Sequence, residues 1–149
     1  MTKFVRVLQA GWGDMDYNAH MRNTAYLDKS ADVRMIYFQE NGFPMSEFER
    51  LRIGPVIMKD ELEYFRELKL LEEVGVSLEL AGLSEDGTRV RLRNVFTRMD
   101  GKIAAKVTST LGWLGLASRR LVAPPETLLS VLTTLERTEG FLVLPSSAK

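Results

Sequence analysis

The sequence predicts an α+β fold in which an antiparallel sheet encloses one long helix. Residues 24–40 have helical periodicity and are apolar over more than one face, so other structure must cover them. Over residues 74–116 apolar side chains alternate with polar ones, and two Asp-Gly turns interrupt the alternation, as in an antiparallel meander. A short apolar strand over residues 4–8 precedes the helix. Wrapping the sheet around the helix is the simplest way to bury both.

The first half of the chain supplies clear boundaries for these elements. Asn23 or Thr24 can cap the helix over residues 24–40, and Gly42 and Pro44 end it. A short helix is predicted over residues 47–51, with Ser46 as its cap. A strand is predicted over residues 55–65, since proline is tolerated at the first position of a strand.

The second half of the chain predicts three consecutive strands and one more helix. The turns between the strands are Ser84-Glu85-Asp86-Gly87 and Met99-Asp100-Gly101. The predicted inward-facing residues are Val74, Val76, Leu78, Leu80, Val90, Leu92, Phe96, Ile103, Ala105, Val107, Ser109, Leu111 and Trp113. Pro124-Pro125-Glu126 predicts a helix start, and we expect that helix to continue to about Arg137. The apolar residues 141–145 have no assigned role.

Composition limits the function classes. The chain has 149 residues, of which 45% are hydrophobic, so we expect one domain over residues 1–149. Twenty basic residues balance 20 acidic ones, which gives no support for a nucleic-acid partner. Without cysteine and with a single histidine, disulfides, thiolate sites and a catalytic zinc are not expected. The sequence shows no secretory signal and no membrane span, so a cytoplasmic protein is expected.

The most informative stretch is the polar segment from Asp14 to Asn23, which joins the first strand to the long helix. It contains Asp16, Asn18 and His20, the only histidine of the chain. Polar groups at the edge of a core are costly to bury unless they are paired. This segment is therefore the first candidate for the catalytic residues.

At these residues the chain resembles the hotdog-fold acyl thioesterases of the 4-hydroxybenzoyl-CoA thioesterase type. Trp12-Gly13-Asp14-Met15-Asp16 is similar to the opening of the bacterial acyl-CoA enzymes, and Asp16-x-Asn18-x-His20 looks like the Asp/Asn/His arrangement of plant acyl-carrier-protein thioesterases. Asn23 and Tyr26 match an asparagine and a tyrosine at the helix start. Arg22 and the pair Tyr17-Asn18 depart from the family pattern, which leaves the substrate subclass open.

The resemblance implies a hotdog fold and hydrolysis of an acyl-CoA or, alternatively, an acyl-carrier-protein thioester. Asp16 would be the nucleophile or general base, although aspartate is also a common turn residue. Asp14 is interpreted as a turn former. His20 and Asn18 would orient Asp16 or the attacking water, unless His20 only bonds a backbone carbonyl and Asn18 only forms a turn. The N–H near Asn23 would hold the thioester carbonyl. No metal or redox cofactor is implied.

Other features leave alternatives open. Arg89, Arg91 and Arg93 share one strand face, which is interpreted as a solvated surface in preference to a site for coenzyme A phosphates. Pairing of subunits into a homodimer or homotetramer is expected, because a single curled sheet leaves edges exposed. A non-catalytic acyl-CoA-binding protein and a hotdog hydratase or dehydratase are the two rival functions.

Overall fold

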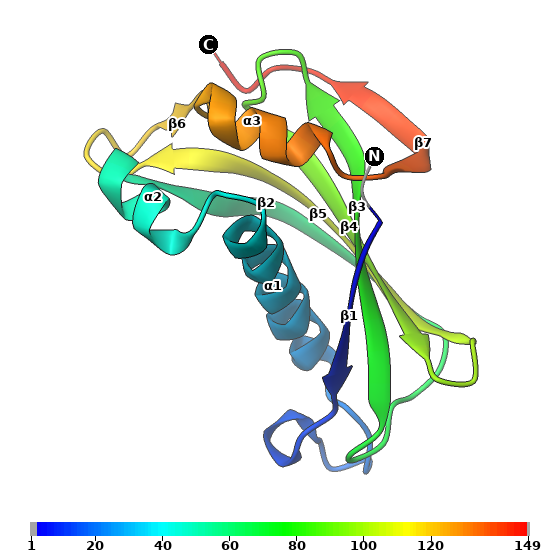
Figure 1. The fold of residues 1–149 in the computed structure, drawn as a ribbon. Coiled ribbons are helices and arrows are strands. Elements are labelled where there is room, and N and C mark those ends of the chain that lie inside the picture. Colours follow the sequence, from blue (N-terminus) through cyan, green and yellow to red (C-terminus); the bar gives the residue numbers. More distant parts are fainter. Residues whose placement is uncertain (1–2, 149) are drawn as a thin grey trace.

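A long helix lies inside a strongly curved sheet in the computed structural model, which describes residues 3–148 (Figure 1). The helices are the 3₁₀ helix η1 (Trp12–Asp14), α1 (Asn23–Glu40), α2 (Met45–Leu51) and α3 (Glu126–Thr133). The strands are β1 (Phe4–Gln9), β2 (Ile53–Tyr64), β3 (Glu73–Ser84), β4 (Val90–Arg98), β5 (Ile103–Gly115), β6 (Leu121–Val122) and β7 (Arg137–Leu144).

The sheet has the strand order β1-β3-β4-β5-β2, with β6 added to β5 and β7 to β3. All neighbours are antiparallel except β7, which runs parallel to β3. The strands β3, β4 and β5 form the predicted meander. The predicted α+β hotdog architecture is therefore confirmed, with β2 as an edge strand that pairs only with β5 among the described residues.

The core lies between α1 and the concave side of the sheet. The helix buries Ala25, Tyr26, Ser30, Val33, Arg34, Tyr37 and Phe38. On the sheet, the residues predicted to face inward are all buried except Ile103, which is partly exposed. Phe38 and Phe48 both pack against Trp113 at the α2 end of this core. Two polar residues, Asn94 and Ser109, also face inward and are fully buried.

Three boundaries in the first half differ from the prediction. The helix α1 begins at Asn23 with Arg22 at its N-cap, so neither Asn23 nor Thr24 caps it. The helix α2 begins at Met45 with Pro44 at its N-cap, so Ser46 lies inside the helix instead of capping it. The strand β2 begins at Ile53, which makes Pro55 its third residue. Proline is tolerated there because β2 is an edge strand and one side of its backbone needs no partner.

The C-terminal region contains a further difference. The helix α3 ends at Thr133, whereas it was predicted to reach about Arg137, which instead begins β7. The last strand includes most of the apolar tail that had no assigned role. Its parallel pairing with β3 supplies backbone hydrogen-bond partners that a sequence pattern cannot reveal. No helix within residues 3–148 has the length and apolar character needed to cross a bilayer.

Candidate active site

The segment between β1 and α1 is a closed loop that displays Asp16. The backbones of Met15 and Met21 form an antiparallel bridge, and Met21 N–H also donates to Leu68 O at 2.7 Å. Inside the loop, Asp16 N–H donates to His20 O at 3.0 Å, and the turn places Ala19 at a left-handed φ of 62°. The loop therefore has a defined shape that is anchored to the segment after β2.

Asp16 has one carboxylate oxygen in the turn and one directed away from it. Its Oδ1 accepts the backbone N–H of Asn18 at 2.8 Å. Its Oδ2 lies 3.8 Å from Nδ1 of His20, and the Asp16 side chain is 28% exposed. The second oxygen thus remains accessible to a ligand or water.

His20 lies beside this carboxylate. Its Nδ1 is 3.1 Å from the carbonyl oxygen of Met21. Because a carbonyl oxygen only accepts, this contact places the proton on Nδ1 and leaves Nε2 as the free acceptor in the neutral ring. Asn18 reaches Asp16 through its backbone, while its side chain is exposed and lies outside the cavity described below.

Asp14 is occupied by other partners. Its carboxylate lies 2.9 Å from Nζ of Lys29 and accepts the backbone N–H of Gly11 at 2.8 Å. Burial raises the pKa of Asp14, but the hydrogen bond and charge of Lys29 and the Gly11 N–H outweigh it, so the pKa falls below its ordinary value. These contacts agree with the interpretation of Asp14 as a structural residue that ties the loop to α1.

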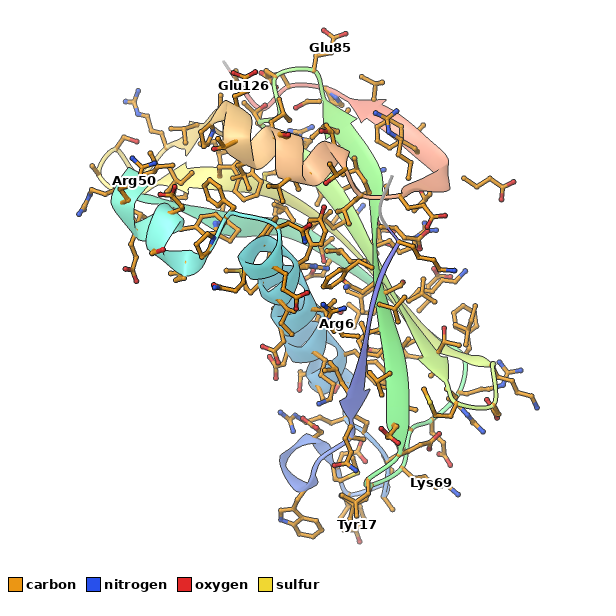
Figure 2. The ribbon with its side chains drawn as sticks, in the orientation of Figure 1. Arg6, Tyr17, Arg50, Lys69, Glu85 and Glu126 are labelled. Atoms are coloured by element: carbon orange, nitrogen blue, oxygen red, sulfur yellow. The ribbon has the colours of Figure 1, made fainter. Side chains whose placement is uncertain are left out.

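A cavity of about 420 Å³ opens beside Asp16 at the start of α1. It is lined by Asp16, His20, Met21, Asn23, Tyr26, Tyr64, Phe65, Arg66 and Glu67. Three of the four predicted site residues therefore meet at one cavity, and Asn18 supports it from the turn. The neighbouring Tyr17 is fully exposed and lies at the same end of the molecule as Lys69 (Figure 2).

The helix start has free backbone donors, and one of them belongs to Asn23, which lines this cavity. Arg22 occupies the N-cap without a side-chain cap bond, and the backbone N–H groups of Asn23 and Thr24 donate to no acceptor within residues 3–148. Such free donors at the positive end of a helix dipole are suited to a developing negative charge. The side chain of Arg22 turns away and donates to Gly13 O and Thr24 Oγ1.

Tyrosines form the apolar wall of the cavity. Tyr26 packs edge-to-face against Tyr64 and Phe96, with ring centroids 5.4 and 5.1 Å apart respectively. Burial raises the pKa of Tyr26 to about 12, with smaller contributions from nearby acidic groups that include Asp16. Tyr26 is therefore a neutral phenol at physiological pH.

Sequence reasoning missed Arg66 and Glu67, and it left Tyr64 and Phe65 unassigned. These residues lie at the end of β2 or just after it, more than 40 positions from Asp16, and no local motif marks them. Only the pairing of β2 with β5, together with the Met21–Leu68 bond, brings them to the helix start. Within residues 3–148, no cluster of three His, Asp or Glu side chains could hold a metal ion.

A curved sheet around one helix, with a carboxylate loop at the helix start, defines a hotdog-fold protein. The chain belongs to the thioesterase-like superfamily, whose family model matches residues 10–132. No curated protein sequence matches it significantly.

Solved structures share the fold at low sequence identity. A hypothetical protein of Staphylococcus aureus, determined in complex with CoA, has a TM-score of 0.82 and 22% identity over 99% of this chain and 94% of its own. A 1,4-dihydroxy-2-naphthoyl-CoA thioesterase of Synechocystis has a TM-score of 0.79 and 10% identity over 89% and 96%. A probable thioesterase of Escherichia coli has a TM-score of 0.75 and 18% identity over 89% and 98%.

Proposed function

We propose that this protein hydrolyses an acyl-CoA thioester to the free acid and the thiol. The observation that carries the proposal is the convergence of two features on one cavity. Asp16 and Asn23, the first residue of α1 with its free N–H, line the same 420 Å³ space. An acyl transfer reaction needs a base or nucleophile on one side of the carbonyl and an oxyanion donor on the other.

In the water-mediated form of the reaction, Asp16 Oδ2 takes a proton from water while the water oxygen bonds to the thioester carbon. The carbonyl oxygen then carries negative charge, which the N–H groups at the start of α1 stabilise. The carbon–sulfur bond breaks as the carbonyl re-forms, and the leaving thiolate takes up the proton. In the alternative form, Asp16 attacks the carbon directly and water cleaves the resulting anhydride.

His20 and Asn18 fix the carboxylate for either route. The Asn18 N–H holds Oδ1, which leaves Oδ2 to react. The histidine is bonded to the carbonyl of Met21, so its ring is a fixed neighbour of Oδ2 at 3.8 Å. The free acceptor Nε2 can orient the attacking water.

Coenzyme A is the thiol carrier we favour. One fold relative was determined with CoA and another is a CoA thioesterase. A carrier-protein thioester, which presents the same reacting group, is the alternative substrate. The cavity is bordered by Tyr64 and Phe65, each about half exposed at the end of the edge strand β2. We infer that a second subunit, in a homodimer or homotetramer, pairs along β2 and covers this side of the site.

The test is thiol release from a panel of short, long and aromatic acyl-CoA esters. Asp16→Asn should lower kcat by about 100-fold or more while the protein remains folded, because it removes the proton acceptor. Asp14→Asn is the matched control, since it makes the same change two residues away on a carboxylate that Lys29 occupies, and it should retain most of the activity. His20→Gln should lower kcat by a smaller factor.

Other outcomes would contradict parts of the proposal. Loss of activity only in Asp14→Asn would show that the wrong carboxylate was chosen. If an acyl-CoA binds tightly and neither it nor the carrier-protein ester releases a thiol, a binding protein would be favoured. A change in the absorbance of an enoyl thioester without thiol release would indicate hydratase chemistry.

A further inference from the structure

A second cavity of about 290 Å³ lies further along α1, where the helix faces β2 and β5. Its walls are mainly apolar and include Leu27, Met35, Phe38, Ile57 and Leu111. Three charged residues, Asp28, Arg34 and Asp60, also line it. A cavity with apolar walls and a few polar groups is the usual form of a small-molecule site.

Arg34 is the unusual member of this lining, because its side chain is buried in the core and the residue is only 7% exposed. Its Nε donates to Asn94 Oδ1 at 3.0 Å and its Nη2 to Ser109 Oγ at 2.7 Å. Burial lowers the pKa of Arg34 to about 10, against the opposing charge of Asp60. Both partners are neutral, and Nη1 donates to no acceptor within residues 3–148. A buried guanidinium without a direct anion is costly unless something else uses its free donors.

Asp60 faces the same cavity from β2. Its Oδ1 accepts the hydroxyl of Ser109, so the serine links the carboxylate to Arg34 without a direct ion pair. Its Oδ2 accepts no hydrogen bond within residues 3–148. The cavity therefore presents a guanidinium donor from buried Arg34 and, on its exposed side at β2, a free carboxylate acceptor from Asp60.

The geometry points to an acyl group that carries an oxygen at its far end, held by Arg34 while the thioester lies at the start of α1. This inference rests on the proposed thioesterase function and specifies its substrate class. Asn23 and Arg34 are eleven residues apart on one helix, a rise of about 16 Å. Helical side chains lean toward the N-terminus, which brings the guanidinium closer to the thioester site. The two cavities share no lining residue, so the acyl chain would pass between them along α1, and the length of the Arg34 side chain covers part of the distance.

Two kinds of oxygen would bind Arg34 differently. A hydroxyl accepts from Nη1 and donates to Asp60, so it uses both free groups. A carboxylate gains a charge-assisted bond to the guanidinium but meets the like charge of Asp60. In either case, a methyl-ended chain that fills the cavity would remove Nη1 from water without giving it a new acceptor, which is costly.

The experiment compares kcat/KM for octanoyl-CoA, ω-hydroxyoctanoyl-CoA and octanedioyl-CoA, with the matching hexanoyl and decanoyl series. At the best chain length, one oxygen-ended ester should exceed the methyl-ended ester by roughly tenfold or more, as expected for a bond to a charged donor. Arg34→Met should lower the ratio of oxygen-ended to methyl-ended cleavage to about one or less, because methionine fills a similar apolar volume without a donor. Arg50→Met is the control, since Arg50 is exposed on α2 and pairs with Glu47, and it should change neither rate.

Asp60→Asn provides a second variant if Arg34→Met does not fold. It should raise the ratio of octanedioyl-CoA to ω-hydroxyoctanoyl-CoA cleavage, because it removes the negative charge beside Arg34. Cleavage with equal or better efficiency for methyl-ended esters at every length would overturn the inference and leave the thioesterase proposal intact. If no ester is cleaved, the proposed function fails. Calorimetric affinities for the same esters then test the inference, which requires tighter binding of an oxygen-ended ester than of the methyl-ended one.

Discussion

Asp14 and Asp16 are chemically identical side chains two residues apart, and their surroundings give them different roles. Asp14 is held by Lys29 and the Gly11 N–H, so both the charge and the geometry of its carboxylate are committed to the fold. Asp16 keeps one oxygen free at the edge of a cavity. A single intervening residue, with its own backbone conformation, is enough to aim the two carboxylates at different neighbours.

The contacts of the Asp14 carboxylate with Lys29 and the Gly11 N–H predict a loss of stability in acid. Its pKa in the folded protein lies below the ordinary value of 3.8, so the ionised form stabilises the fold above that pH. This contribution is lost as the pH falls from 3.8 through the lower pKa of the folded state. Asp14→Asn should therefore cost about 1 kcal/mol of unfolding free energy at neutral pH, and the difference from wild type should shrink toward zero in acid. Urea unfolding at a series of pH values measures both quantities.

A double-mutant cycle with Lys29→Met identifies the partner. If the ion pair carries the effect, Asp14→Asn should cost much less in the Lys29→Met background than in wild type. A cost that is equal in both backgrounds, or that does not change with pH, would contradict the role given to this pair.

The local residues of the site were predictable, whereas its distant wall was not. Asp16, His20 and Asn23 lie within eight positions of the chain, so a strand-to-helix junction brings them together whatever the rest of the fold does. Tyr64, Arg66 and Glu67 reach the same cavity through the pairing of β2 with β5. That register depends on a bulge between Ile57 and Lys59, which no residue pattern in β2 indicates.

At the scale of elements, the sequence pattern predicts the middle of a strand or helix more accurately than its ends. The alternation in β3, β4 and β5 holds over most of each strand because one face is buried and a slip by one residue would expose it. Among these three strands, the register shifts between Leu80 and Gly82 and between Phe96 and Thr97. The end of α3 instead depends on a tertiary contact. Tyr37 of α1 donates its hydroxyl to Val131 O at 2.6 Å and lies 2.8 Å from Thr134 Oγ1, just where the helix stops.

This contact predicts that Tyr37 couples α3 to α1. Tyr37→Phe keeps the buried ring but removes the hydroxyl, so Val131 O loses one hydrogen-bond donor in a partly buried place. We expect a loss of about 1 kcal/mol in unfolding free energy, with faster amide hydrogen exchange over residues 131–137. The comparison is Tyr17→Phe, whose ring is fully exposed and which should change neither measurement. Unchanged exchange in Tyr37→Phe would show that α3 is held by its apolar face alone.

For the whole molecule, the most consequential feature is the free edge of β2. This strand has 12 residues, pairs only with β5 among the described residues, and exposes 44% of Ile57 and 41% of Met58. A long edge with exposed apolar side chains usually pairs with another chain. The same edge ends at Tyr64, beside the Asp16 cavity, so assembly and catalysis are expected to depend on each other.

The corresponding prediction concerns mass and activity together. Light scattering should give twice or four times the mass of one chain, in agreement with closed two-fold symmetry. Met58→Lys places a charge on the free edge and should weaken association by roughly tenfold or more, with specific activity falling on dilution at the concentrations where the assembly separates. Met99→Lys makes a similar change at a residue that is 60% exposed in the β4–β5 turn, and it should preserve both mass and activity. A monomeric wild type with full activity would mean that the Asp16 cavity is complete within one chain, and the exposed edge of β2 would then need another explanation.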